Sequence, residues 1–235
     1  MLKSLYNAIR DDAVASIAVE VDGRTYTSRP LAPVPMPTAT PLVVHTLSGL
    51  RGYIESGIDE CGDYFLLVET PCKVSLKSKI IGSFRERETL CIAEYTPPAF
   101  HFNTWLSPEE FIIGLQSCFL PEHDYVNVLQ YVSDVKAVLG ESVSDDGISQ
   151  TVTVKKGISQ MGTAALPNPV TLTPIRYFPD VEQVLSKYVF RAKKMDNGIG
   201  FRLIEADGGG WEMDAIRVLG EHLKELTGNK LPVIA

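Results

Sequence analysis

A proline-rich segment at residues 30–41 limits the folds open to this chain more than any other part of its sequence. Five of its twelve residues are proline, at positions 30, 33, 35, 37 and 41. Proline has a fixed φ and no backbone N–H, so the segment can form neither a helix nor a central strand. We expect an extended arm of polyproline II type. It is either a linker or, because Leu31, Val34 and Met36 stand between the prolines, an arm that packs along a neighbouring subunit.

Two hairpins are indicated by turn dipeptides next to alternating segments. Asp22-Gly23 follows the alternating residues 17–21, and Asn197-Gly198 lies between residues 188–193 and 201–205. Such dipeptides are strong hairpin signals because both central residues of the turn need a positive φ. Further strands are predicted at residues 42–44, 64–68, 74–76, 90–92, 151–154 and 170–173.

The clearest helix start is Ser107-Pro108-Glu109-Glu110. Ser107 can cap the helix, Pro108 suits its first turn, and Glu110 completes a capping box. Apolar residues then recur every three or four positions on both sides of Pro121, which predicts a helical hairpin. The sequence predicts helices near residues 2–10, 46–56, 108–119, 122–139 and 211–226.

Together these elements indicate an α+β fold, in which a helical hairpin and a C-terminal helix pack on antiparallel strands and hairpins. We expect an N-terminal α+β lobe at residues 1–100 that carries the proline-rich arm (30–41), and a C-terminal α+β domain at residues 101–235.

The charge balance and hydropathy exclude several classes of protein. The chain has 22 basic and 29 acidic residues, a net charge of −7, which counts against a protein that wraps duplex nucleic acid. No apolar run approaches the roughly 20 residues of a membrane helix, and polar residues interrupt the start of the chain where a secretory signal would need an apolar core. We therefore expect no membrane partner and a cytoplasmic location, with the four cysteines reduced and buried.

The sequence contains none of the familiar catalytic or metal-binding motifs. There is no GxSxG, HExxH, GxGxxG or CxxC, and Asp145-Asp146-Gly147 lacks the spacing of a calcium loop. The glycine-rich residues 207–210 are either a tight turn or an anion-binding loop, and the neighbouring Glu205 and Asp207 favour the turn. We expect no catalytic residues, no metal and no cofactor.

Aromatic and basic residues alternate in one stretch, from residue 176 to residue 202. A sheet that exposes aromatic rings beside cations could stack a nucleotide or the bases of a single strand. Alternatively, the rings belong to the core and the cations to the outer face of the same strands. Under the binding hypothesis the candidate residues are Arg176, Tyr188, Arg191 and Lys193.

Several segments of the second half resemble a family of phage and prophage proteins of unknown function that includes YfdQ. The segments are Thr104–Phe111, Ser144–Gln150, Pro167–Val170, Tyr188–Arg191 and Glu205–Trp211. The resemblance implies a bacteriophage or prophage origin and a location in the host bacterial cytoplasm. It implies no established activity and carries no catalytic residues.

The leading functional hypothesis is a non-enzymatic, phage-encoded protein that works as a homo-oligomer, with a ring or a shell among its closed forms. The proline-rich arm and edge-to-edge pairing of the strands at 151–154 and 170–173 are the expected contacts between subunits. The alternative is an accessory or anti-defence protein that binds or sequesters a nucleotide or single-stranded nucleic acid.

Overall fold

The computed structural model describes residues 3–8, 19–21, 24–26, 38–59, 63–81, 85–136, 143–145, 150–156, 160–166, 168–196 and 198–235. Contacts divide the chain into two compact units. The first comprises residues 1–38 and 81–86, and the second comprises residues 39–80 and 87–235.

The first unit contains a short helix and the predicted N-terminal hairpin. Residues 3–8 are helical, within the predicted range 2–10. Strands β1 (Val19–Val21) and β2 (Arg24–Tyr26) pair antiparallel, with Val19 opposite Tyr26, which confirms the hairpin. Leu31, Val34 and Met36 lie outside the described residues, so the role of the proline-rich arm stays a prediction.

The second unit begins with a five-stranded sheet in the order β14-β4-β5-β6-β3. Its centre is an antiparallel meander of β4 (Tyr64–Thr70), β5 (Lys73–Ser78) and β6 (Thr89–Glu94). The edge strands β3 (Leu42–Val44) and β14 (Val233–Ile234) join it in parallel pairs with β6 and β4.

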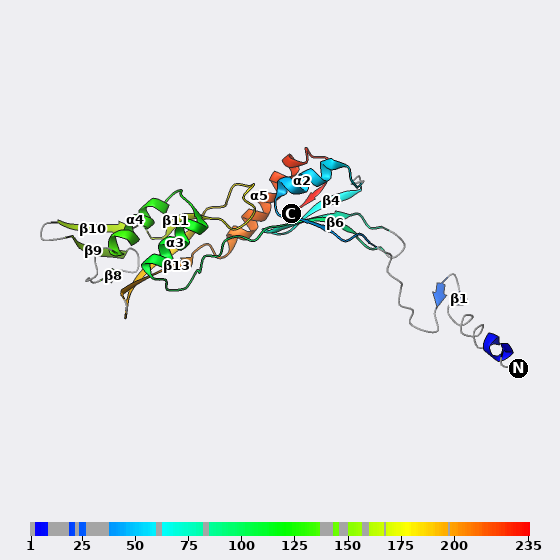
Figure 1. Ribbon diagram of the computed structural model, residues 1–235, viewed down its shortest axis with the longest axis horizontal. Coiled ribbons are helices and arrows are strands. Elements are labelled where there is room, and N and C mark those ends of the chain that lie inside the picture. The colour runs from blue at the N-terminus through cyan, green and yellow to red at the C-terminus, as the bar shows by residue number, and fades with distance from the viewer. Residues whose placement is uncertain are drawn as a thin grey trace. The chain divides into compact units, whose positions relative to one another are not determined.

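Helices α2 (Leu47–Ser56) and α5 (Gly210–Leu226) lie on one face of this sheet (Figure 1). Thr46 caps α2, within the predicted range 46–56, by accepting a hydrogen bond from the Gly49 N–H at 2.9 Å. The helices bury Leu47, Leu50, Leu219 and Leu223 against alternate residues of β4, β5 and β6. We call this group the sheet-1 core.

A four-stranded sheet in the order β13-β12-β11-β7 carries the second core. Its long hairpin consists of β12 (Ser186–Met195) and β13 (Gly198–Glu205) and is continued by β11 (Val170–Pro174) and β7 (Phe119–Leu120). Helices α3 (Pro108–Cys118) and α4 (Tyr125–Lys136) pack on this sheet (Figure 1). Phe111, Leu115, Tyr131, Phe190 and Phe201 are central members of this group, the sheet-2 core.

These elements confirm the predicted α+β class, with the helical hairpin and the C-terminal helix packed on largely antiparallel sheets. The capping box is present, since the Ser107 hydroxyl accepts from the Glu110 N–H and the Glu110 carboxylate accepts from the Ser107 N–H. The helix predicted at 122–139 begins later, at Tyr125, because Asp124 hydrogen-bonds both backbone groups of Thr171 through its own N–H and carboxylate.

The two hydrophobic cores do not separate at residue 100. Tyr177, Phe178 and the α5 leucines come from the second half of the sequence but belong to the sheet-1 core with residues 47–93. Segments from both predicted parts therefore build one core together.

The strands expected to pair between subunits find partners within the chain. Strand β9 (Gln150–Lys156) lies between β8 (Val143–Asp145) and β10 (Gln160–Leu166). Strand β11 lies between β12 and β7. An assembly model for this chain must therefore start from another surface.

Candidate functional site

Arg176 lies where the two hydrophobic cores meet. It belongs to the connection between β11 and β12, and its guanidinium carbon is 4.3 Å from the centroid of the Trp211 ring. Trp211 packs against the sheet-1 core. The same guanidinium is 5.2 Å from the Phe102 centroid and 5.6 Å from that of Tyr188, and both rings belong to or pack on the sheet-2 core.

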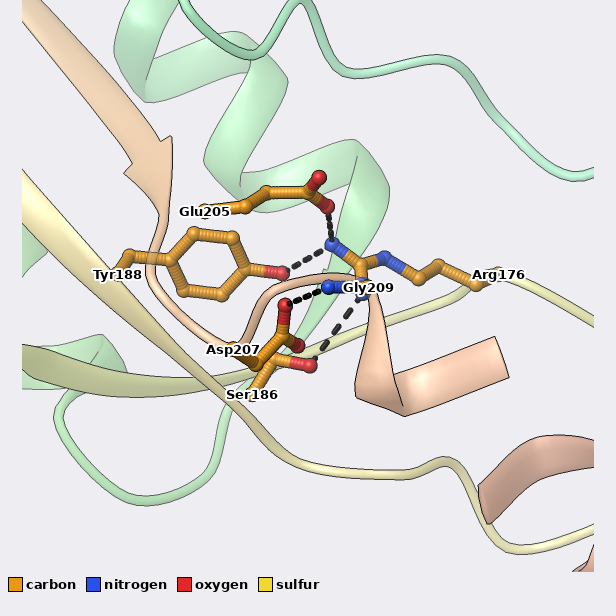
Figure 2. Close-up of polar contacts among 6 residues, drawn as sticks. All are labelled: Arg176, Ser186, Tyr188, Glu205, Asp207 and Gly209. Carbon is orange, nitrogen blue, oxygen red and sulfur yellow. Dashed lines mark hydrogen bonds and ion pairs between the residues drawn. The ribbon is translucent and has the colours of Figure 1, made fainter. Parts of the chain in front are cut away.

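The guanidinium also has a set of polar partners (Figure 2). One terminal nitrogen donates to the Ser186 hydroxyl at 3.3 Å, and the other donates to the Tyr188 hydroxyl and to the Glu205 carboxylate. Arg176 is only 9% exposed, so its charge is balanced by Glu205 rather than by water. Burial raises the pKa of the Tyr188 hydroxyl above its ordinary value, although the charge of Arg176 acts in the opposite direction. The cluster has the character of a structural anchor.

The glycine-rich loop next to this cluster is a tight turn, the reading that its acidic neighbours favoured. Gly208 and Gly209 have φ angles of 64° and 80°, a backbone region that suits glycine. The Asp207 carboxylate accepts a hydrogen bond from the Gly209 N–H at 3.1 Å (Figure 2). A carboxylate of the chain therefore already uses an N–H group that an anion would need at this helix start.

The four predicted ligand-binding residues do not share a face. In β12, Ser186, Tyr188 and Phe190 point into the core, so Arg191 and Lys193 point to the opposite side of the sheet. The aromatic residues of the stretch form core: Tyr177, Phe178, Tyr188, Phe190 and Phe201 are each at most 2% exposed. They cannot stack bases, and a ligand that contacted Arg191 and Lys193 could not reach Arg176 or Tyr188 from the same side.

The outward side of the β12–β13 hairpin is basic. Arg191 lies directly opposite Arg202, and Lys193 lies opposite Gly200. Lys187 and Lys193 are exposed, and the Arg202 guanidinium carbon is 4.5 Å from the centroid of Trp105. We call the group of Lys187, Arg191, Lys193, Arg202 and Trp105 the outer basic face.

Reasoning from the sequence missed Trp105 as a member of this face. Leu106 pairs with Phe201 through two backbone hydrogen bonds of 2.9 Å, which places the preceding residue beside Arg202. This pairing joins residues almost a hundred positions apart. A Trp before a capped helix and an Arg in a strand give no local sign that they meet.

The five-stranded sheet has an apolar row across the face opposite its helices. The register aligns one outward residue from every strand: Ile234, Leu67, Ser75, Ile92 and Val43. At least one neighbour of each residue along its strand packs on or in the sheet-1 core, namely Val233, Leu66, Val74, Cys91 and Val44, so these five point away from α2 and α5. Val43 is 55% exposed and Ile234 is 52% exposed. We call this set the apolar row.

Charged residues lie on the same face beside the apolar row. The Glu69 carboxylate accepts hydrogen bonds from Lys77 at 2.7 Å and from the Ser75 hydroxyl at 2.9 Å, and it lies 3.5 Å from Lys73. The hydrogen bond from Lys77 lowers the pKa of Glu69, with smaller contributions in the same direction from Ser75 and Lys73. The apolar row therefore runs across the strands, and charged residues flank it further along β4 and β5.

Metal-binding and nucleophilic groups are sparse among the described residues. Within them, no three His, Cys, Asp or Glu side chains gather closely enough to hold a metal ion. Cys91 and Cys118 are free and buried, as predicted, whereas Cys72 is free but only half-buried, and Cys61 lies outside the described residues. Partial burial raises the pKa of the Cys72 thiol. In the part of the chain that the structure describes, no helix is both long and apolar enough to cross a membrane.

No family model, curated protein or solved structure matches this chain. The resemblance to the YfdQ family therefore stays a prediction, and the functional argument rests on the surfaces described above.

Proposed function

We propose that this chain is a non-enzymatic protein of phage or prophage origin that assembles with copies of itself. The observation that carries the proposal is the apolar row on the face of the five-stranded sheet opposite α2 and α5. A sheet is stable when its apolar face is buried against another layer, and this sheet has apolar residues on both faces. A second protein layer on the row would give the second face the burial that the helices give the first.

The composition of the row favours a second copy of the same chain as that layer. The row reads Ile, Leu, Ser, Ile and Val from β14 to β3, with two apolar residues on each side of Ser75. A two-fold axis along β5 would place Ile234 and Leu67 of one copy over Val43 and Ile92 of the other. This self-complementarity is what an interface between identical copies requires. Two sheets packed in this way form a sandwich about 10 Å thick.

The charges beside the row fit the same arrangement. Along their strands, Glu69 and Lys77 follow the row on opposite sides, and within one copy the Lys77 ammonium reaches back to the Glu69 carboxylate at 2.7 Å, beside Ser75. If the two-fold axis ran along the row instead of along β5, Lys77 of one copy would come near Glu69 of the other. With either axis, apolar residues of one copy contact apolar residues of the other. Burying apolar surface contributes about 25 cal/mol for each Å² removed from water, so the row supplies the affinity and the charges orient it.

In the sequence, the proline-rich arm immediately precedes strand β3. Met36 is seven residues before Val43, which belongs to the row and to the edge strand β3. We include Leu31, Val34 and Met36 in the proposed interface between copies. The host bacterial cytoplasm and a closed ring or shell remain part of the proposal, on the strength of the family resemblance and of the closed symmetry that homo-oligomers usually adopt.

Native mass measurement on matched variants tests the proposal. Val43→Asp with Ile234→Asp places charges in the row, whereas Val126→Asp with Ile113→Asp places them on α4 and α3 at positions that are 62% and 57% exposed. We expect the wild type and the control to be oligomers at micromolar concentration and the row variant to be a folded monomer of 25.8 kDa. A monomeric wild type contradicts self-assembly, and an oligomeric row variant moves the interface elsewhere.

A further inference from the structure

The outer basic face has no part in the proposed assembly, because it lies on the other sheet. We infer that it binds single-stranded nucleic acid, with the cations contacting phosphates and the Arg202–Trp105 pair supporting a base. This is a function beyond self-assembly. It keeps Arg191 and Lys193 of the candidates that the sequence suggested, and it replaces Arg176 and Tyr188 with Lys187, Arg202 and Trp105.

The first observation is a concentration of positive charge in an acidic chain. The outward positions of the paired strands, from Lys187 to Lys193 and from Gly200 to Ile204, hold four cations and no acid, although the whole chain carries a net charge of −7. Arg191 and Arg202 occupy directly opposed positions, and Arg191 also donates to the Phe190 carbonyl at 3.1 Å. Guanidinium groups are suited to phosphate oxygens, so a phosphate near this pair could contact both.

The second observation is a support for a base. The guanidinium carbon of Arg202 lies 4.5 Å from the centroid of the Trp105 ring. The Nε of Arg202 is buried and has no hydrogen-bond partner within the described part of the chain. Bases stack on aromatic rings and on arginine planes that are held in place. Next to this pair, Val189 and Ile204 are opposed on the same face and half-buried, so they form a small apolar surface between the cations.

The geometry favours a single strand over a duplex. Lys187 and Lys193 are six residues apart on one strand, which spans about 20 Å. That length suits a short site, comparable with the lower limit of about four nucleotides for known single-strand binders. Bases that lie on this sheet surface would contact the Arg202–Trp105 pair and the short apolar side chains of Val189 and Ile204, and only unpaired bases expose the flat faces that such contacts need. The net acidity of the chain opposes the close approach of a long duplex.

A binding assay with matched lysine variants tests the charge. The probes are fluorescent 20-mers of deoxythymidine and of uridine and a duplex of the same length. Lys187→Ala with Lys193→Ala removes two exposed cations from the face, and the control, Lys224→Ala with Lys230→Ala, removes two exposed cations on and after α5. We expect the wild type and the control to bind the single strands alike. For the face variant, the slope of log affinity against log salt should fall in magnitude by about 1.4, since each lost phosphate contact removes about 0.7.

Tryptophan fluorescence tests the stacking support, because the chain has two tryptophans, Trp105 and Trp211. In a Trp211→Phe background, the remaining emission comes from Trp105 and should be quenched by the single strands. In a Trp105→Phe background the quenching should disappear, and Trp105→Ala should weaken binding about tenfold or more.

The result is decisive either way. The inference would be overturned if neither single strand bound. It would also be overturned if the face variant and its control lost the same affinity for the single strands, or if the duplex bound more tightly than they do. Preference between deoxythymidine and uridine identifies the natural strand as DNA or RNA. The native mass of the Lys187→Ala, Lys193→Ala variant should equal that of the wild type, which separates a failure of this inference from a failure of the assembly proposal.

Discussion

The guanidinium carbon of Arg176 lies 4.3 Å from the centre of the Trp211 ring, and this contact joins the two hydrophobic cores of the second unit. Trp211 lies in the first turn of α5, which packs on the five-stranded sheet, whereas the other aromatic neighbours of the guanidinium, Phe102 and Tyr188, belong to or pack on the sheet-2 core. One side chain is therefore shared between two cores whose residues otherwise contact different helices.

Replacing Arg176 should destabilise both cores together. Arg176→Ala removes the partner of Glu205 and three aromatic contacts, and we expect it to lower the free energy of unfolding by about 3 kcal/mol, a usual cost of breaking a buried pair. Urea unfolding followed by Trp fluorescence and by circular dichroism measures the effect. The urea midpoints from the two signals should coincide in the wild type and differ in the variant.

Two further variants identify the cause. Arg217 is 62% exposed and pairs with Asp214 and Glu221 of its own helix, so Arg217→Ala should change the free energy of unfolding by less than about 0.5 kcal/mol. Arg176→Lys retains the charge but not the planar group that stacks on Trp211, and it should recover only part of the loss. Full recovery by lysine would mean that charge alone matters at this position.

Local signals in the sequence predicted most of the elements. Asp22-Gly23 and Ser107-Pro108-Glu109-Glu110 act on neighbours within four residues, so the hairpin and the capped helix follow from the sequence directly. Strand β10 was not predicted, because its Gly162, Ala164 and Ala165 have little preference for strands and gain it only by pairing with β9.

The surfaces could not be predicted in the same way because they depend on register between distant strands. The apolar row takes Val43, Leu67, Ile92 and Ile234 from four strands, two of which join the sheet in parallel at its edges. For the aromatic–basic stretch at residues 176–202, the sequence likewise could not determine which side chains are buried. Alternation along β12 indicates two faces, but only packing against α3 and α4 determines that the rings are inside and the cations outside.

Tyr131 should govern part of the stability at high pH. Its hydroxyl is buried and has no hydrogen-bond partner among the residues that the structure describes, and burial raises its pKa to about 12. In the unfolded chain a tyrosine ionises near pH 10, so the unfolded state loses its proton first as the pH rises. The stabilising contribution is complete below about pH 10 and is lost between about pH 10 and pH 12.

Tyr131→Phe isolates this contribution. Near neutral pH the variant should be as stable as the wild type or more stable by about 1 kcal/mol, because it removes an unsatisfied hydroxyl and leaves the ring contacts with Phe190 and Phe201. Above pH 10 its stability should fall less steeply, by about 2 to 3 kcal/mol over the two units. Tyr177, whose pKa burial also raises to about 12, keeps part of the fall in both proteins. Parallel curves of unfolding free energy against pH would contradict the assignment.

Two helical glycines should respond in opposite directions to the same substitution. Gly52 is exposed in α2, and a Cβ added there would have no atom within 4 Å, so Gly52→Ala should stabilise the protein by about 1 kcal/mol through helix propensity. In α3, a Cβ on Gly114 would lie 2.9 Å from two atoms of the Phe100 ring. That ring is held by contacts with Phe102, Phe111 and Phe119, so it cannot move aside without disturbing the sheet-2 core.

Overpacking a core costs about 1 to 3 kcal/mol, which exceeds the gain in helix propensity. Gly114→Ala should therefore lower the urea midpoint, whereas Gly52→Ala should raise it. A rise for both variants would show that the Phe100 ring has room to shift and that the core around it is looser than its aromatic contacts indicate.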